Sequence, residues 1–197
     1  SRQLFEDIPY LVHAREEHDQ FAATLRESGV EVCYLLDLVA EAVVEPDVKA
    51  QLVEDFILEI GLSVRGMEQQ VREYLLELPV PQMLASMVRG VRKSDLGNQT
   101  PAHLVDYIDD AYPFFVDPMP NLYFTRDPFF MVAGGVCVSS MANAVRARET
   151  LFGQYLFTHH PRYKNTPMLH ARTDPFSIEG GDVLVLSPEV VAIGISQ

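Results

Sequence analysis

The chain has 197 residues, of which 48% are hydrophobic and 22% are charged. This balance is typical of a globular protein with a proper core and excludes an intrinsically disordered chain. The formal net charge of −13, from 28 Asp and Glu against 15 Lys and Arg, argues against a nucleic-acid-binding protein, since such proteins present basic patches.

The first unit, over residues 1–36, is predicted to be a helix followed by a strand. Asp7 can cap a helix with Pro9 in its first turn, and Gly29 provides a stop signal. Six residues between them recur on one face at helical spacing. They are Leu11, Ala14, His18, Phe21, Ala22 and Leu25. Residues 31–35 have the composition of a strand, so we expect an incomplete α/β module here.

Residues 37–110 are predicted to be a helical bundle inserted into a β-containing domain. Alternation of β-branched residues stops there, and Pro and Gly separate four or five short helical segments. Two apolar stripes recur at helical spacing, which favours bundle core over a cofactor site. They are Val64, Met67, Val71, Tyr74, Leu75 and Leu78 in the first, and Leu84, Met87, Val88 and Val91 in the second. Residues 92–99 are predicted to be a polar connector. The apolar stripes of the bundle offer a dimer surface, so we expect a homo-oligomer.

The β-rich character returns at Tyr112, and residues 111–197 contain two predicted hairpins. The order strand, strand, helix, strand appears once and then begins again. The expected elements are strands 129–133 and 136–140 around Gly134-Gly135, a helix 143–157, a strand 168–172, and strands 183–186 and 190–195 around residues 187–189. Ala144, Leu151 and Tyr155 are expected to face inward from the helix.

An acid precedes each hairpin, Asp127 the first and Glu179 the second, 52 residues apart. A repeat of that period favours an architecture in which equivalent loops converge. Two converging carboxylates can bind a planar guanidinium, whose N–H donors form a fixed fork. The sequence therefore predicts a site for an arginine-like compound, although each acid is also an ordinary turn residue.

Five further polar residues are candidates for a functional role. Asp182 could contact a ligand or bond the amides of its own turn, and both roles stay open. Arg146 could grip a substrate carboxylate, whereas Arg148 is expected to be solvated. The His159-His160 pair has no third ligand at suitable spacing, so we predict no metal site.

The two cysteines, Cys33 and Cys137, lie in apolar runs that read as strands. We therefore expect buried free thiols in a reducing cytosol, and poor nucleophiles. The most apolar stretch, residues 129–138, is too short to span a bilayer, and no cationic leader opens the chain. We predict a soluble cytoplasmic protein that binds neither membrane nor nucleic acid.

Several motifs closely resemble those of bacterial arginine deiminases. They are residues 4–9 (LFEDIP), 117–128 (DPMPNLYFTRDP), 148–151 (RETL), 157–161 (FTHHP) and 178–182 (IEGGD). The FTRD and EGGD elements alone would indicate only the wider guanidino-group-modifying superfamily. The inserted helical segment favours the deiminases over dimethylarginine hydrolases, which lack it. The resemblance runs over essentially the whole chain and matches the N-terminal half of the family.

The resemblance implies an α/β fold, here a partial five-bladed α/β propeller of ββαβ modules with an inserted helical bundle. It also implies cofactor-free hydrolysis of L-arginine to L-citrulline and ammonia through a covalent cysteine–thiouronium intermediate. In that family pattern Asp127 and Glu179 are the catalytic acids that hold the guanidinium nitrogens. Substrate-binding positions are Leu4 over the pocket, Phe124 against the substrate, Asn121 and Arg146 at its carboxylate, and Asp182.

The family's reacting residues are missing from this sequence. Its cysteine lies in a Cys-Met-Ser-Met-Pro-like segment and its histidine in a His-Leu-Asp element, and neither occurs here. We therefore expect a chain that is trimmed at both ends, supplies the binding half of the site and is inactive alone. A related amidinotransferase or agmatine deiminase fits the insertion and Arg146 less well. A non-catalytic arginine-binding or assembly module is the alternative from another class.

Overall fold

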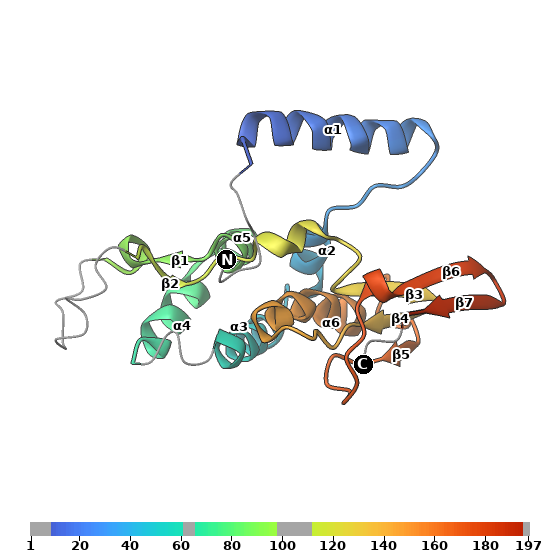
Figure 1. Ribbon diagram of the computed structural model, residues 1–197. Helices are drawn as coiled ribbons and strands as arrows, with labels where there is room; N and C mark the ends of the chain where they lie inside the picture. The colour runs from blue at the N-terminus through green and yellow to red at the C-terminus, as the bar shows by residue number, and fades with distance from the viewer. Residues whose placement is uncertain (1–8, 61–65, 98–111, 195–197) are drawn as a thin grey trace.

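The computed structural model describes residues 9–60, 66–97 and 112–194, which form a mixed α/β structure (Figure 1). Helices dominate the first half of the chain, and most strands come from the second half. The α-helices are α1 (Leu11–Glu27), α2 (Leu35–Ala42), α3 (Pro46–Ile60), α4 (Glu68–Glu77), α5 (Val80–Arg89) and α6 (Thr150–His159). The strands are β1 (Val91–Arg92), β2 (Phe114–Val116), β3 (Phe129–Val132), β4 (Gly135–Val138), β5 (Met168–His170), β6 (Val183–Ser187) and β7 (Val190–Ile193).

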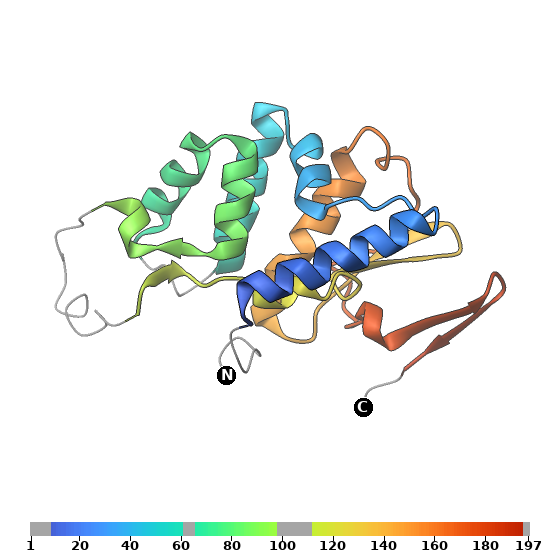
Figure 2. The same ribbon diagram turned by 90° about the horizontal axis from the view of Figure 1, so that it is seen from above.

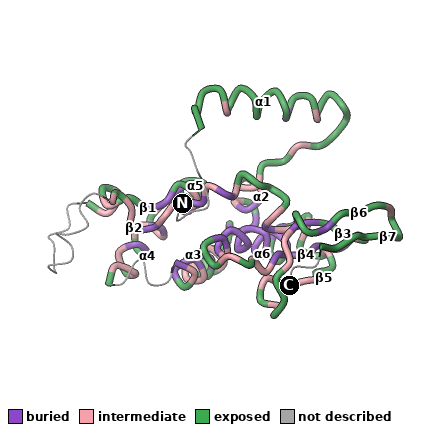
Figure 3. Tube along the Cα trace, in the orientation of Figure 1, coloured by how far each residue is buried: buried purple, intermediate pink, exposed green. Residues whose placement is uncertain are grey.

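Helices α2 to α5 pack with α6 around one apolar core, which is the purple region of Figure 3. The two predicted stripes supply much of it, because amphipathic helices bury their apolar face. Val71, Leu75, Leu84, Met87 and Val91 are all fully buried. These side chains are therefore taken up by the core of the chain itself and are not free to form a dimer surface. Val64 lies outside the described residues.

The interpretation of residues 92–99 as a mere polar connector was wrong at its start. Strand β1 pairs antiparallel with β2, and a 3₁₀ helix, η2 (Lys93–Leu96), follows it. Gly90 permits this pairing, because its φ is +83° and a Cβ there would lie 2.5 Å from the Val116 carbonyl oxygen. The helical and β-rich segments thus share a small sheet, while the division at residues 36 and 110 stays a prediction.

The first predicted hairpin is confirmed, with its turn one residue earlier than expected. Ala133 and Gly134 form the turn with φ of 49° and 78°. Positive φ at both central positions is the turn geometry whose twist matches the flanking strands. The chain then passes through α6 and returns as β5, which lies parallel to β4 in the order β3-β4-β5.

The helix predicted over residues 143–157 is two consecutive elements. A 3₁₀ helix, η5 (Ala144–Glu149), begins after Asn143, whose side chain accepts a hydrogen bond from the Val145 amide at 3.0 Å. Helix α6 follows directly and buries Leu151 and Tyr155, as expected. Ala144 is exposed, so its predicted inward position was wrong.

The second hairpin, β6–β7, is also confirmed and projects from the body of the molecule (Figure 2). Its residues are mostly exposed, except Val183 at the start of β6, which packs with Phe130 and Cys137. An isolated antiparallel bridge between Ser140 and Ile178 connects the end of the first hairpin to the start of the second. The entrances of the two hairpins are therefore neighbours in space.

The helix predicted near the N-terminus is confirmed as α1, and much of its apolar face is exposed. Ala22 is buried, whereas Phe21 and Leu11 remain 64% and 58% exposed. Figure 1 shows α1 standing apart from the core. The helix begins after Tyr10 without a side-chain cap, and Asp7 lies outside the described residues.

The strand predicted over residues 31–35 was wrong. Residues 31–34 connect two helices without regular structure, and α2 begins at Leu35. A short apolar run carries little information about whether it is strand or helix. Cys33 is consequently exposed, against our expectation, while Cys137 is buried in β4 and burial raises the pKa of its thiol.

Candidate functional site

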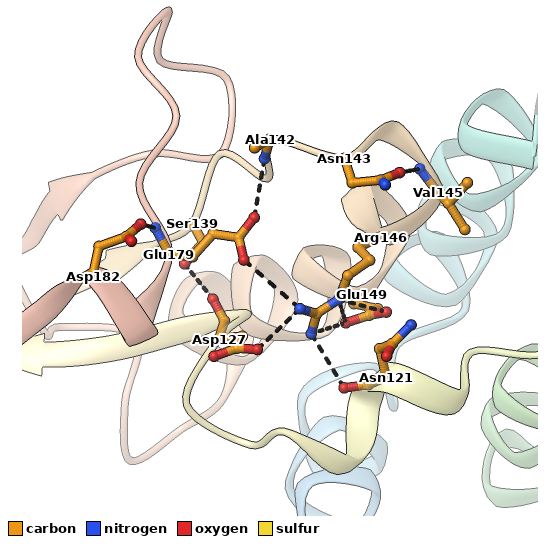
Figure 4. Close-up of polar contacts among 10 residues, drawn as sticks. All are labelled: Asn121, Asp127, Ser139, Ala142, Asn143, Val145, Arg146, Glu149, Glu179 and Asp182. Carbon is orange, nitrogen blue, oxygen red and sulfur yellow. Dashed lines mark hydrogen bonds and ion pairs between the residues drawn. The ribbon is translucent and has the colours of Figure 1, made fainter. Parts of the chain in front are cut away.

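The two predicted acids come together where the hairpins begin (Figure 4). Asp127 follows a 3₁₀ helix, η4 (Pro120–Tyr123), and directly precedes β3. Glu179 directly precedes another 3₁₀ helix, η6 (Gly180–Asp182), which leads into β6. Helix η5 approaches the same place with Arg146, so several short elements supply the side chains.

Backbone contacts hold the two hairpin entrances together. The Gly180 amide donates to the Asp127 carbonyl at 3.4 Å, and the Ser139 hydroxyl donates to the same carbonyl at 2.5 Å. The Ile178 amide donates to the Ser140 carbonyl at 3.2 Å. Residue 180 must be glycine for this approach, because a Cβ there would lie 2.0 Å from the Arg126 carbonyl oxygen.

The guanidinium of Arg146 lies between the two acids. Its Nη1 donates to Asp127 Oδ2 at 2.9 Å and lies 3.7 Å from Glu179 Oε2. Arg146 is only 8% exposed, and both acids are partly buried. Charge pairs shielded from water in this way are stronger than those on the surface. The carboxylate pair therefore binds a guanidinium in this structure, and that guanidinium belongs to the chain.

Glu149 is a third acid at the same guanidinium. Its Oε2 accepts from Arg146 Nη2 at 2.9 Å and from Nε at 3.1 Å, and its side chain is 2% exposed. Burial raises the pKa of the Glu149 carboxyl, and Arg146 offsets part of that rise. Burial by itself lowers the pKa of Arg146, but hydrogen bonds to Glu149 and Asp127 outweigh burial and raise it.

Asn121 and Phe124 complete the surroundings of Arg146. The backbone carbonyl of buried Asn121 accepts from Arg146 Nη2 at 3.2 Å. The Phe124 ring centroid lies 5.9 Å from Arg146 Cζ, within the range of a cation–π contact, and the ring is 48% exposed. Both residues predicted for substrate binding therefore lie at the acid pair, around the arginine.

Asp182 bonds the backbone of its own turn, beside Glu179. The Asp182 carboxylate accepts from the Glu179 amide at 3.1 Å, and Figure 4 shows it turned toward that backbone. Of its two open roles, the structure places it in the turn-bonding one. Leu4 lies outside the described residues.

Arg148 is buried, so the expectation that it is solvated was wrong. Its Nη2 donates to the Pro118 carbonyl at 2.8 Å. Burial lowers the pKa of its guanidinium, and the charges of Asp117 and Glu149 offset part of that effect. The 3₁₀ geometry of η5 turns this side chain inward, which helical periodicity from the sequence did not anticipate.

Glu149 and Ser139 are the residues at the site that sequence reasoning missed. A weak signal existed for Glu149, because an acid three residues after an arginine lies on the same helical face. Ser139 gave none, since its hydroxyl acts on a backbone carbonyl that only the folded chain brings near.

His160, of the pair for which no metal site is predicted, has partners other than the two acids. His160 is buried, with Nε2 3.1 Å from Glu41 Oε2 and Nδ1 accepting from the Arg162 amide at 3.1 Å. Within residues 9–60, 66–97 and 112–194, no three His, Cys, Asp or Glu side chains are grouped to hold a metal ion. No α-helix in these same ranges is both long and apolar enough to cross a membrane.

Fold and site together define a mixed α/β protein whose hairpin entrances carry carboxylates that hold a guanidinium group. The family model described as arginine deiminase matches residues 1–197. The chain therefore belongs to the arginine deiminase family, and the resemblance drawn from its motifs is confirmed.

Individual relatives agree with the family model. The chain is similar to an arginine deiminase of Staphylococcus haemolyticus, with 47% identity over 196 residues. It is 46% identical to arginine deiminase 1 of Staphylococcus epidermidis and to an arginine deiminase of Staphylococcus aureus. Each match covers 98% of this chain and 47% of the relative. The chain thus spans about half the length of the curated relatives it matches.

Proposed function

We propose that this chain supplies the substrate-binding half of an enzyme that hydrolyses L-arginine to L-citrulline and ammonia. The observation that carries the proposal is the placement of Asp127 and Glu179 on either side of a guanidinium nitrogen. Membership of the arginine deiminase family supports the same substrate class. The side chain of arginine ends in the very group that these acids bind.

The two acids would act by orientation and by charge. Carboxylates that pair with the guanidinium nitrogens fix the direction from which the central carbon can be attacked. They also keep the group cationic, which maintains the electrophilic character of that carbon. A cysteine thiolate then adds to the carbon and ammonia leaves, and water hydrolyses the resulting thiouronium to citrulline and the free thiol. Neither that cysteine nor the histidine that would serve as acid and base is among the motifs of this chain.

The remaining predicted residues take supporting roles in the proposal. Phe124 would lie against the guanidinium plane, and Asn121 and Arg146 would meet the carboxylate end of the substrate. Leu4 would cover the pocket, and Asp182 would fix the turn that carries Glu179. No cofactor is required, because the thiolate and the acids supply the chemistry.

We also propose that the chain forms part of a five-bladed α/β propeller. The order β3, β4, α6, β5 is one ββαβ module, and β6–β7 has the position of the next hairpin. Asp127 and Glu179 stand at equivalent points of these two units. The free thiols agree with a cytoplasmic location, and the exposed apolar residues of α1 and β6–β7 agree with a homo-oligomer. A crystal structure of a full-length protein would show whether the propeller has five blades.

The activity can be tested in a full-length chimera. This chain is joined to the part of the Staphylococcus haemolyticus relative that it does not cover, and citrulline is measured after incubation with L-arginine. Asp127→Asn in the chimera retains the shape but removes the charge, and it should lower turnover by at least about a hundredfold. A folded chimera that forms no citrulline, or an Asp127→Asn form as active as its parent, would contradict the proposal.

A further inference from the structure

Arg146 meets the three carboxylates with two different edges of its guanidinium (Figure 4). The Nε–Nη2 edge faces Glu149, at 3.1 Å and 2.9 Å from Oε2. Nη1 faces the other two acids, at 2.9 Å from Asp127 and 3.7 Å from Glu179. One edge therefore belongs to a fully buried acid, and the remaining nitrogen belongs to the two acids proposed to bind substrate.

A substrate guanidinium and Arg146 cannot use Asp127 in the same way at once. Nη1 already donates to Oδ2, and two cations at such short range repel each other. The substrate can pair with both acids only after Nη1 has left them. The contacts with Glu149 do not involve Nη1, so they can persist while that exchange takes place.

We propose that Glu149 is a positioning residue that holds Arg146 by its Nε–Nη2 edge while Nη1 passes from Asp127 to the carboxylate of an arginine-class substrate. The inference rests on the proposed function and deepens it. A guanidinium ligand without a carboxylate displaces Nη1 from the acids and offers Nη1 no acceptor in exchange. A ligand that carries both groups replaces the contact that it removes.

The position of Glu149 suits this role. It lies three residues after Arg146 on the same short helix and directly precedes α6, so both side chains come from one continuous segment. Its carboxylate is shielded from water and accepts from two nitrogens of the same guanidinium. Without Glu149, an Arg146 that left Asp127 and Glu179 would be a buried cation without a carboxylate partner, which is strongly unfavourable.

Ligand binding to this chain tests the proposal with opposite expected signs. Agmatine has the guanidinium of arginine and no carboxylate, and both ligands are titrated by calorimetry. Arg146→Ala removes the competing cation, so agmatine should bind roughly tenfold or more tightly, and the preference for arginine should disappear. Glu149→Gln leaves Arg146 dependent on Asp127 and Glu179, so agmatine should bind roughly tenfold or more weakly, and arginine should lose less.

Two further variants keep the test decisive. The double variant Arg146→Ala/Glu149→Gln removes both charges together, so it leaves no unpaired buried acid if Arg146→Ala alone folds poorly. It should bind agmatine more tightly than the unsubstituted chain, as Arg146→Ala should. Arg72→Ala is the matched control, because Arg72 pairs with Glu54 of α3 and with Gln69 of its own helix, and not with any of the three acids. It should change neither affinity by more than about twofold. Circular dichroism verifies that each variant is folded.

The proposal is overturned if Glu149→Gln binds agmatine as tightly as the unsubstituted chain. It is equally overturned if the double variant is folded and binds agmatine no more tightly than the unsubstituted chain does. A folded double variant that shows no agmatine binding at millimolar concentration counts as the same result. A purely structural role for both residues would weaken binding in both single variants. The measurement involves no turnover, so an inactive chimera would contradict the proposed function and leave these affinities to decide the role of Glu149.

Discussion

Gly180→Ala should separate the two acids of the site, because residue 180 has no room for a side chain. A Cβ there would lie 2.0 Å from the Arg126 carbonyl oxygen and 2.7 Å from its carbonyl carbon. Both are backbone atoms that cannot rotate away. Real Cβ atoms essentially never lie closer than 3.0 Å to another heavy atom, so the hairpin entrances must part by at least about 1 Å.

The size of the effect follows from that displacement. Overpacking costs about 1–3 kcal/mol of folding free energy, and the hydrogen bond from the Gly180 amide to Asp127 would lengthen beyond 3.4 Å. In a chain of this length, each kcal/mol lowers Tm by roughly 2–4 °C. A misplacement of about 1 Å in a binding group lowers activity by on the order of a hundredfold, so arginine turnover by the chimera should fall on that scale.

The neighbouring glycine is a matched control. A Cβ at Gly181 would meet only Asp127 Oδ1, at 3.7 Å, which is an ordinary contact. Gly181→Ala should therefore unfold close to the parent temperature and retain most activity. Thermal unfolding by circular dichroism and citrulline formation are measured for both variants. If Gly180→Ala unfolds at the same temperature as Gly181→Ala, the close approach does not constrain the site and the reasoning fails.

Three further predictions concern the core, an ion pair and the thiols. Phe152→Ala should cost about 3–5 kcal/mol in urea unfolding, because Phe152 is fully buried, and the exposed control Phe176→Ala should cost less than about 0.5; equal costs would contradict the assigned core. Hydrogen bonding to Arg72 holds the pKa of Glu54 below 4.5, so this stabilisation is present above pH 4.5 and lost as pH falls through the lowered pKa. Glu54→Gln should therefore cost less than about 1 kcal/mol at neutral pH and progressively less as the pH falls through that lowered pKa, and a cost that grows on acidification would refute the sign. An alkylating thiol reagent should modify exposed Cys33 in the folded chain and reach Cys137 only after denaturation, as measured by mass spectrometry. Modification of Cys137 in the native protein would contradict its burial.

The hairpins and most helices could be predicted because their signals are local. The β-rich runs around Gly134, and the helical spacing around Val71 and Leu84, each depend on a few neighbouring positions. The predicted turn was one residue too late because Ala133 adopts a positive φ, which is uncommon for a residue other than glycine. Element type was therefore accessible from the sequence, and element boundaries were less so.

Burial could not be predicted in the same way, because it depends on what the rest of the chain brings alongside. The stripe containing Leu11 and Phe21 has the spacing of a buried face, yet both of these side chains are exposed and only Ala22 of the stripe is buried. Arg148 has the chemistry of a surface residue, yet η5 directs it inward to the Pro118 carbonyl. Periodicity identifies which side of a helix is apolar and leaves open whether that side meets a partner.

The acid pair was predicted and its contact with Arg146 was not, for a related reason. Motif positions indicate that Asp127 and Glu179 serve one site, but they carry no information about how charges within the chain balance there. The structure places a guanidinium between acids from distant segments and gives it a third, buried acid. Only the folded chain reveals that Arg146, expected to bind a substrate carboxylate, contacts Asp127, expected to bind the substrate guanidinium.

The charge balance of this cluster explains why it should favour a ligand that is cationic at one end and anionic at the other. Three carboxylates, Asp127, Glu149 and Glu179, surround one guanidinium, so the cluster with Arg146 carries two excess negative charges. A second guanidinium lowers that excess and is attracted, but it forces Arg146 to give up Asp127. A carboxylate on the same ligand then supplies the lost partner without adding a separate anion from solution. Under the proposed function, selectivity for an amino acid over an amine without a carboxylate would therefore arise from one arginine shared between neighbouring acids, and it would depend on Glu149 keeping that arginine in place.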